Sequence, residues 1–201
     1  MAITRFSSSR LTQGLPKYQT AWDSDNVAQG AMEPIGYQIV SSPSVTQVFF
    51  NNIPQHYQDL MLVANARQAT NNSTGLYIRL NSTAHNRSYT WLEGGGTSVT
   101  TSRVAVAGDG YSQIGQIVPS NASAGYFGTA VAHIFNYTNT NTFKTLFGRS
   151  AMDSNGSGGV RYEVALAQIT SAITSLEIVT DAITGIESGS SFALYGIRSG
   201  S

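Results

Sequence analysis

The fold is decided by two stretches near the end of the chain: residues 173–179 read I-T-S-L-E-I-V, and residues 191–197 read S-F-A-L-Y-G-I. In the first stretch Leu176 and Ile178 alternate with a serine and a glutamate, and the second repeats the pattern with a phenylalanine and a leucine. A period of two is typical of a strand that buries one face. The two stretches therefore predict a pair of sheet strands joined by a polar, glycine-containing connection.

The chain repeats this pattern from residue 37 onward. The predicted strands span residues 45–50, 59–68, 76–81, 87–92, 103–107, 113–118, 126–136, 143–150, 160–169, 175–180 and 190–197. Clusters of glycine, asparagine and serine separate them, and no apolar stripe has the 3.6-residue period of a helix. So many short strands predict an all-β protein, an antiparallel β-sandwich that is jelly-roll-like and spans residues 37–201.

The alternation also assigns faces within single strands. Leu76, Ile78 and Leu80 share one face, which we expect to be buried in the core. On two other strands small residues oppose larger apolar ones. Ala130 and Ala132 alternate with Val131. On the other strand one face carries Arg161, Glu163, Ala165 and Ala167, and the opposite face carries Val160, Tyr162, Val164 and Leu166. We expect the larger residues to point into the core, which leaves the alanines as flat faces that a neighbouring subunit can approach closely.

Residues 1–36 differ from the rest in having no sustained period, two prolines and a run of serines. Large side chains stand singly along this polar segment: Phe6, Leu11, Leu15, Tyr18 and Trp22. Anchors spaced in this way are typical of an extended peptide that lies on another surface. We expect an extended N-terminal arm whose anchors bind a partner; a strap across the chain's own domain is the alternative.

The composition favours a surface built from hydroxyl and amide groups. Only 11% of the 201 residues are charged, with 11 basic and 11 acidic side chains, whereas there are 25 serines, 20 threonines and 13 asparagines. Such a surface suits a protein packed in an assembly or one that hydrogen-bonds sugars, although the loops of an ordinary β-domain favour the same residues. Zero net charge without a basic run argues against nucleic acid as a partner.

The chain has no cysteine, so disulfides, thiolate metal sites and a cysteine nucleophile are excluded. Residues 1–10 lack the apolar centre of a signal peptide, and no segment reaches the apolar length of a membrane span. We therefore expect synthesis in a cytoplasm, without secretion and without a membrane partner.

Residues for catalysis or metal binding are present but scattered. His56, His85 and His133 lie far apart in the sequence, and no carboxylates stand beside them at ligand spacing. The acid pairs Asp153 with Glu163 and Glu93 with Asp109 lie mostly in turns. The loop at residues 153–159 offers a single carboxylate to a calcium ion. We expect no enzymatic activity, no cofactor and no metal.

Aromatic side chains with polar neighbours give the one signal of a binding site. They are Tyr77, Tyr89, Trp91 and Tyr111, together with Tyr126 and Tyr137. Aromatic faces stack on sugar rings and also anchor protein interfaces. A third interpretation, that these rings fill the core of the sandwich, stays open.

Several stretches resemble small structural proteins of tailed bacteriophages, especially aquatic ones. The resemblance is carried by N-Y-T-N-T-N-T-F-K-T at residues 136–145, D-S-N-G-S-G at 153–158, F-A-L-Y-G-I at 192–197 and L-Y-I-R-L-N at 76–81. The segment Q-G-L-P-K-Y at residues 13–18 resembles the head-end peptide of other phage virion proteins. Residues 81–89 depart from the family's usual pattern. The resemblance implies a non-enzymatic component of the virion, made in the host cytoplasm.

Two functions follow as expectations. The first is a capsid decoration or cement protein that its N-terminal arm anchors to the major capsid protein or to a tail protein. The alternative is a tail-fibre or baseplate module that binds a glycan of the host surface. We also expect a homo-oligomer, because so weakly charged a chain lacks the repulsion that keeps single domains apart. The phage resemblance favours a trimer.

Overall fold

The computed structural model describes residues 31–42, 44–70, 72, 74–181 and 185–198. These residues form no α-helix and are mostly strands. The strands are β1 (Met32–Ile39), β2 (Ser44–Val45), β3 (Gln47–Phe50), β4 (Asp59–Ala66), β5 (Gly75–Leu80), β6 (Arg87–Gly95), β7 (Ser98–Val106), β8 (Tyr111–Gln116), β9 (Gly128–Ile134), β10 (Lys144–Asp153), β11 (Gly158–Ala167), β12 (Leu176–Thr180), β13 (Ile186–Glu187) and β14 (Ser191–Ile197).

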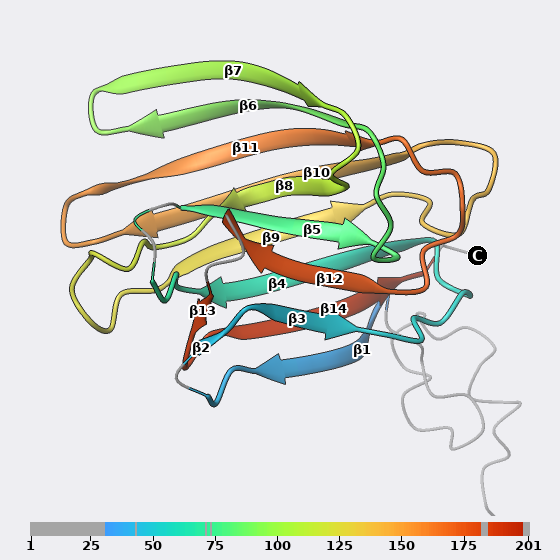
Figure 1. Ribbon diagram of the computed structural model, residues 1–201, viewed down its shortest axis with the longest axis horizontal. Coiled ribbons are helices and arrows are strands. Elements are labelled where there is room, and N and C mark those ends of the chain that lie inside the picture. Colours follow the sequence, from blue (N-terminus) through green and yellow to red (C-terminus); the bar gives the residue numbers. More distant parts are fainter. Residues whose placement is uncertain (1–30, 43, 71, 73, 182–184, 199–201) are drawn as a thin grey trace, which may run out of the picture.

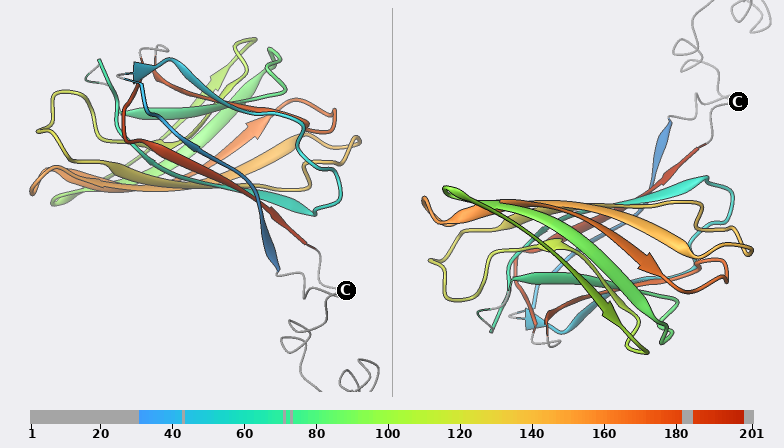
Figure 2. Two further views of the ribbon diagram at one scale, coloured as in Figure 1. Left: turned by 90° about the horizontal axis from the view of Figure 1, so that it is seen from below. Right: turned by 90° about the horizontal axis from the view of Figure 1, so that it is seen from above.

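The strands form two antiparallel sheets that face each other (Figures 1 and 2). The large sheet has the order β1-β14-β4-β9-β10-β11-β6-β7, and the small sheet has the order β3-β12-β5-β8. A short pair, β13 with β2, lies beside them. The prediction of an antiparallel sandwich is confirmed.

The topology is that of a jelly roll with two inserted hairpins. Without β6–β7 and β10–β11, four strands remain in each sheet, in the orders β1-β14-β4-β9 and β3-β12-β5-β8. Every connection among these strands crosses from one sheet to the other, except the connection from β5 to β8. This order defines a jelly roll. The two hairpins add four strands to one side of the large sheet, which thereby extends beyond the small one (Figure 1).

The core lies between the sheets and is built from the apolar positions that the alternation marks. Leu76, Ile78 and Leu80 of β5 are fully buried, as predicted. The two stretches that decide the fold take central places: β12 lies between β3 and β5, and β14 lies between β1 and β4. Each pairs along both of its edges; β12 is buried at every position, whereas β14 is buried at every second one.

The sandwich begins five residues earlier than the sequence predicts. Residues 32–36 belong to β1, which pairs with β14 from Met32 to Ile39. The sequence pattern does not predict this part of β1, because it contains Pro34 and Gly36 and neither residue type is typical of a strand interior. The structure accommodates them because β1 is an edge strand, and its register shifts between Pro34 and Gly36. All eleven predicted strands are present, whereas β1, β2 and β13 were missed.

The prediction that alanines form outer faces is wrong. Ala130, Ala132, Ala165 and Ala167 are at most 2% exposed. They lie beneath the small sheet, where β8 packs closely on β9, β10 and β11. A Cβ at Gly148 would overlap the carbonyl oxygen of Ile114, and a Cβ at Gly115 would lie 2.7 Å from that of Ser150. At so short a distance between sheets only small side chains fit.

Candidate functional site

The structure joins the four aromatic residues named first in the sequence into a row that alternates with arginines. The guanidinium of Arg79 lies 4.8 Å from the centre of the Tyr111 ring. That of Arg87 lies 5.8 Å from Tyr77 and 5.2 Å from Tyr89. The row continues along β6 from Tyr89 to Trp91, whose ring centres are 5.6 Å apart, and ends at Arg161, 4.5 Å from the Trp91 ring. Each contact is a cation–π or aromatic pair.

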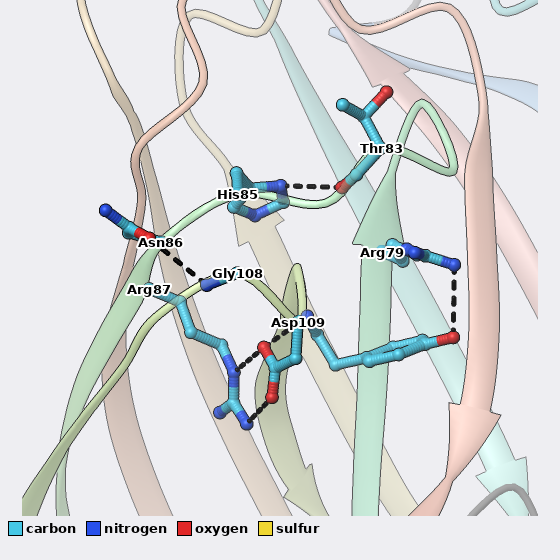
Figure 3. A network of polar contacts seen from close by, with 8 residues as sticks. Arg79, Thr83, His85, Asn86, Arg87, Gly108 and Asp109 are labelled. Carbon is cyan, nitrogen blue, oxygen red and sulfur yellow. Dashed lines mark hydrogen bonds and ion pairs between the residues drawn. The ribbon is translucent and has the colours of Figure 1, made fainter.

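One part of this row forms a pocket, which we call the tyrosine pocket. Its volume is about 290 Å³, and its lining consists of Tyr77, Arg87, Asp109, Tyr111, Val179, Thr180 and Asp181. Figure 3 shows the polar contacts on one side of it. Arg87 donates hydrogen bonds from Nε and Nη2 to the two carboxylate oxygens of Asp109, at 2.6 and 2.7 Å. Arg79 donates from Nη1 to the hydroxyl of Tyr111 at 3.2 Å.

The local sequence explains why Asp109 is held in place. Gly108 and Gly110 on either side of it have φ angles of 78° and 73°, values that a side chain rarely adopts. A Cβ at Gly110 would also lie 2.5 Å from the carbonyl oxygen of Thr83. The turn between β7 and β8 therefore depends on these glycines, and it aims the carboxylate at Arg87.

The electrostatics of the tyrosine pocket keep its groups in fixed charge states. The hydrogen bonds from Arg87 lower the pKa of Asp109, so this carboxylate stays ionised. Burial raises the pKa of Tyr77, so its phenol stays protonated. The Nη1 of Arg87 is buried and has no partner within the described residues. The pocket thus offers ionic hydrogen-bonding groups beside aromatic rings, a set that suits a small polyhydroxyl ligand.

Tyr126 and Tyr137 lie elsewhere. Tyr137 is completely buried, and its hydroxyl donates a hydrogen bond to the carbonyl of Pro54. It is a core residue of the β9–β10 connection, so for this ring the interpretation that it fills the core is confirmed. Tyr126 is half-buried in the β8–β9 connection.

A second candidate is the face of the large sheet that points away from the small sheet, which we call the outer face. In register across all its strands, one row reads Tyr37, Ala193, Val63, Val131, Arg149, Tyr162, Leu92 and Thr101. The next row contains Tyr195, Met61, His133, Phe147, Val164, Thr90 and Arg103. Both rows are dominated by apolar and aromatic side chains, and the outer face is therefore largely apolar.

The exposed apolar side chains concentrate on the inserted hairpins. Val160, Tyr162 and Val164 of β11 are 52%, 49% and 48% exposed, and Leu92 beside them on β6 is 50% exposed. The rings of Phe147 and Tyr162 stack at 6.3 Å. Two depressions, of about 190 and 510 Å³, lie side by side here and share Thr129, Ala151 and Val160 in their walls.

The opposite side of β11 carries its charges into the protein, which reverses the expected orientation of this strand. Arg161 and Glu163 are 5% and 2% exposed. Arg161 donates from Nε to Glu163 at 2.9 Å and from Nη1 to Glu93 at 3.3 Å. Burial raises the pKa of Glu163 to about 7, although the Arg161 guanidinium opposes this shift. Alternation thus separated the two faces correctly, but the apolar face lies outside.

The remaining sequence candidates form no metal site in the part of the chain that the structure describes. No three His, Asp or Glu side chains there gather closely enough to hold a metal ion. His133 lies on the outer face and contacts Asp59 at 3.1 Å. Asp153 accepts a hydrogen bond from the backbone of Gly156 and so closes the β10–β11 turn. The arm anchors Phe6, Leu11, Leu15, Tyr18 and Trp22 lie outside the described residues.

Comparisons with known proteins add no name to these sites. The chain matches no family model and no curated protein. Within the described ranges the structure also contains no helix that could serve as a membrane span.

The outer face is the feature that sequence reasoning missed. A signal was present on the opposite side of the same strands, where Ala132 lies opposite Gly148 and, in the next row, Ala130 lies between Ala64 and Ser150. Such a row of small residues indicates close packing against another layer. It therefore marks the buried side even where the other side is more apolar.

Proposed function

We propose that this chain is a non-enzymatic structural protein of a bacteriophage virion. In this proposal it decorates the capsid, its N-terminal arm attaches it to the shell or to a neighbouring subunit, and the sandwich packs in an assembly. The observation that carries the proposal is the apolar outer face of the large sheet.

The energetics of this face favour a protein partner. Fully burying a side chain of this kind contributes about 1.5–3 kcal/mol, so a half-exposed one leaves roughly 1 kcal/mol unrealised. Five such side chains lie close together here: Val160, Tyr162, Val164, Leu92 and Phe147. A partner that covers them gains on the order of 5 kcal/mol. Contiguous exposed apolar patches on soluble domains mark interaction sites.

Composition and resemblance support a virion more than another assembly. A chain with 11% charged residues has little electrostatic protection against association, which suits a life inside a particle. The stretches that resemble tailed-phage structural proteins coincide with the β9–β10 connection, the β10–β11 turn, β5 and β14. The jelly roll itself occurs in viral capsid and lectin domains alike, so its support is by analogy.

The experiment that tests the proposal is the copy number of the protein in purified virions of the phage that encodes it. Quantitative mass spectrometry against the major capsid protein gives this number directly. Hundreds of copies per particle are expected for a capsid decoration protein. A few to a few dozen copies would move the protein to the tail, and its absence from virions would overturn the proposal.

The tyrosine pocket favours one alternative, a tail-fibre or baseplate module that binds a host glycan. Its volume of about 290 Å³ suits a single sugar ring, and it pairs aromatic faces with an Arg87–Asp109 couple that can hydrogen-bond neighbouring hydroxyls. Binding of the purified chain to polysaccharide extracted from the host tests this alternative. Asp109→Asn should abolish binding, whereas Tyr37→Ala on the far edge of the large sheet should leave it unchanged. No binding by the unmodified chain would exclude it.

A further inference from the structure

We propose that the outer face binds residues 18–27 of a neighbouring copy of this chain, with Trp22 in the depression beside Arg149 and with Asp23 and Asp25 against the guanidinium of Arg149. The inference uses the proposed function in one respect only: it takes the outer face to be a protein contact surface.

The charges of the chain point to this segment. Arg149 and Arg103 are the only charged side chains in the two central rows of the outer face, and within the described residues neither has a carboxylate partner. Most other charged side chains are already occupied. Ion pairs join Arg79 to Glu177, Arg87 to Asp109, Arg161 to Glu93 and Glu163, and Arg198 to Glu33; Arg67 and Lys144 donate to backbone carbonyls.

The carboxylates left outside the described residues are Asp23 and Asp25. They follow Trp22 directly in the stretch A-W-D-S-D at residues 21–25. A large aromatic ring next to two carboxylates complements a face that is apolar and whose central charges are positive. The first 30 residues contain no other acidic side chain, so this is the one stretch of the arm that can pair its carboxylates with the arginines of the outer face.

The shape of the outer face offers a place for the ring. The smaller depression, of about 190 Å³, lies between β9, β10 and β11. Val131, Val160 and Tyr162 supply its apolar walls, and Arg149 stands at its rim. Its size fits one aromatic side chain. Anchors that fill a pocket of this kind dominate the energetics of protein interfaces.

The path of the chain favours a neighbouring copy over the same chain. β1 begins on the side of the outer face, displaced from the rest of the large sheet, and runs from there into the sandwich (Figure 2). From Met32 to Arg149 there are four strand spacings and a register offset of about four residues, together roughly 23 Å. The nine Cα–Cα steps from Trp22 to Ala31 span at most about 30 Å. To reach the outer face of its own chain, the segment would have to reverse direction before β1, and the reversal would use up the difference between these two lengths. A neighbouring copy that faces the outer face can supply the segment without such a reversal.

Engineered disulfides test the inference cleanly, because the chain contains no cysteine. One copy carries Ser24→Cys in the arm, and a second copy with a different mass tag carries Thr129→Cys in the wall of the depression. Under mild oxidation the mixture should give a disulfide-linked heterodimer. The matched control replaces Thr129→Cys by Phe49→Cys, which is 41% exposed on the small sheet and should not cross-link.

The outcomes separate the alternatives. A double variant with Ser24→Cys and Thr129→Cys that forms only an intramolecular disulfide would overturn the inference and place the segment on its own chain. Equal cross-linking of the Phe49→Cys control, or no heterodimer at all, would also overturn it. None of these results changes the copy number in virions, so the proposed function is tested separately.

Charge reversal gives an independent readout in the otherwise unmodified chain. Arg149→Glu should weaken self-association at least tenfold in sedimentation experiments. Combining it with Asp23→Arg and Asp25→Arg should restore association to near the original level. If the unmodified chain stays monomeric at tens of micromolar, or if the triple variant is not rescued, the inference is wrong.

Discussion

Two neighbouring positions on β11 provide a sharp test of which side of the large sheet is buried. Val164→Thr and Ala165→Thr introduce the same side chain at adjacent positions of one strand. Val164 is 48% exposed on the outer face, whereas Ala165 is 1% exposed beneath the small sheet. The two variants therefore place the same hydroxyl on opposite faces of β11, in place of a side chain of equal size at Val164 and of a smaller one at Ala165.

The structure sets the expected magnitudes. At Val164 the new hydroxyl reaches water, so the free energy of unfolding should change by no more than about 0.5 kcal/mol. At Ala165 two extra heavy atoms must fit between closely packed sheets, at a cost of about 1–3 kcal/mol. Burying the hydroxyl without a partner adds roughly 1–3 kcal/mol. The expected loss at Ala165 is therefore about 2–6 kcal/mol.

Urea unfolding followed by Trp91 fluorescence, in a Trp22→Phe background, measures both values. The orientation derived from the structure predicts a large loss for Ala165→Thr and almost none for Val164→Thr. The opposite order, with Val164→Thr as the damaging change, would show that the apolar side of β11 is the buried one and would remove the basis for the outer face.

Three further predictions concern two buried charged side chains and one glycine in a turn. The pKa of Glu163 is about 7 in the folded protein and 4.5 when exposed, so protonation of this carboxyl favours folding. Its contribution of about 3 kcal/mol is fully present below pH 4.5 and is lost as the pH rises through 7, so Glu163→Gln should reduce the pH dependence of the free energy of unfolding, measured with urea from pH 5 to 8. Arg67 donates hydrogen bonds to the carbonyls of Ser120, Ala122, Ser123 and Tyr126. Arg67→Met should therefore lower the free energy of unfolding by roughly 2–4 kcal/mol and speed amide hydrogen exchange in residues 120–126, and an unchanged exchange rate there would refute this role. Gly110→Ala places a Cβ at a φ of 73° and against Thr83, so it should cost at least about 1 kcal/mol; a neutral effect on thermal unfolding would contradict the account of this turn.

The sequence predicts the strands well because alternation is a local property. The strands predicted at residues 175–180 and 190–197 are β12 and β14, with bounds correct to within one residue. The edge strand β1 was missed because its proline and glycine break the pattern, and only pairing with β14 makes it a strand. The strand propensity of a short segment does not indicate whether a strand that is distant in the sequence will pair with it.

The orientation of β11 could not be predicted, for a related reason. Alternation identifies two faces but does not say which one a second layer covers. Here the small sheet covers Arg161 and Glu163, which pair with each other, and Arg161 also pairs with Glu93. The apolar face of a strand is normally the buried one. In β11 the arrangement is reversed, because the inserted hairpins extend the large sheet past the width of its core.

The aromatic residues of the row were predicted, but the construction of the row and of the tyrosine pocket was not. Polar neighbours single out Tyr77, Tyr89, Trp91 and Tyr111 in the sequence, and the structure brings them into one row. The arginines between them come from β5, β6 and β11, and the carboxylate comes from the β7–β8 turn. Their convergence depends on tertiary structure, which spacing in the sequence does not reveal.

The central claim, that the outer face is covered inside the particle, is tested most directly by hydroxyl-radical footprinting of intact virions. Phe147 and Tyr162 on the outer face are 38% and 49% exposed in the isolated domain, and Phe49 on the small sheet is 41% exposed, so the three rings start from similar accessibility. The account predicts that labelling of Phe147 and Tyr162 falls severalfold relative to Phe49 when virions are labelled. Equal labelling of all three rings in the particle would contradict it.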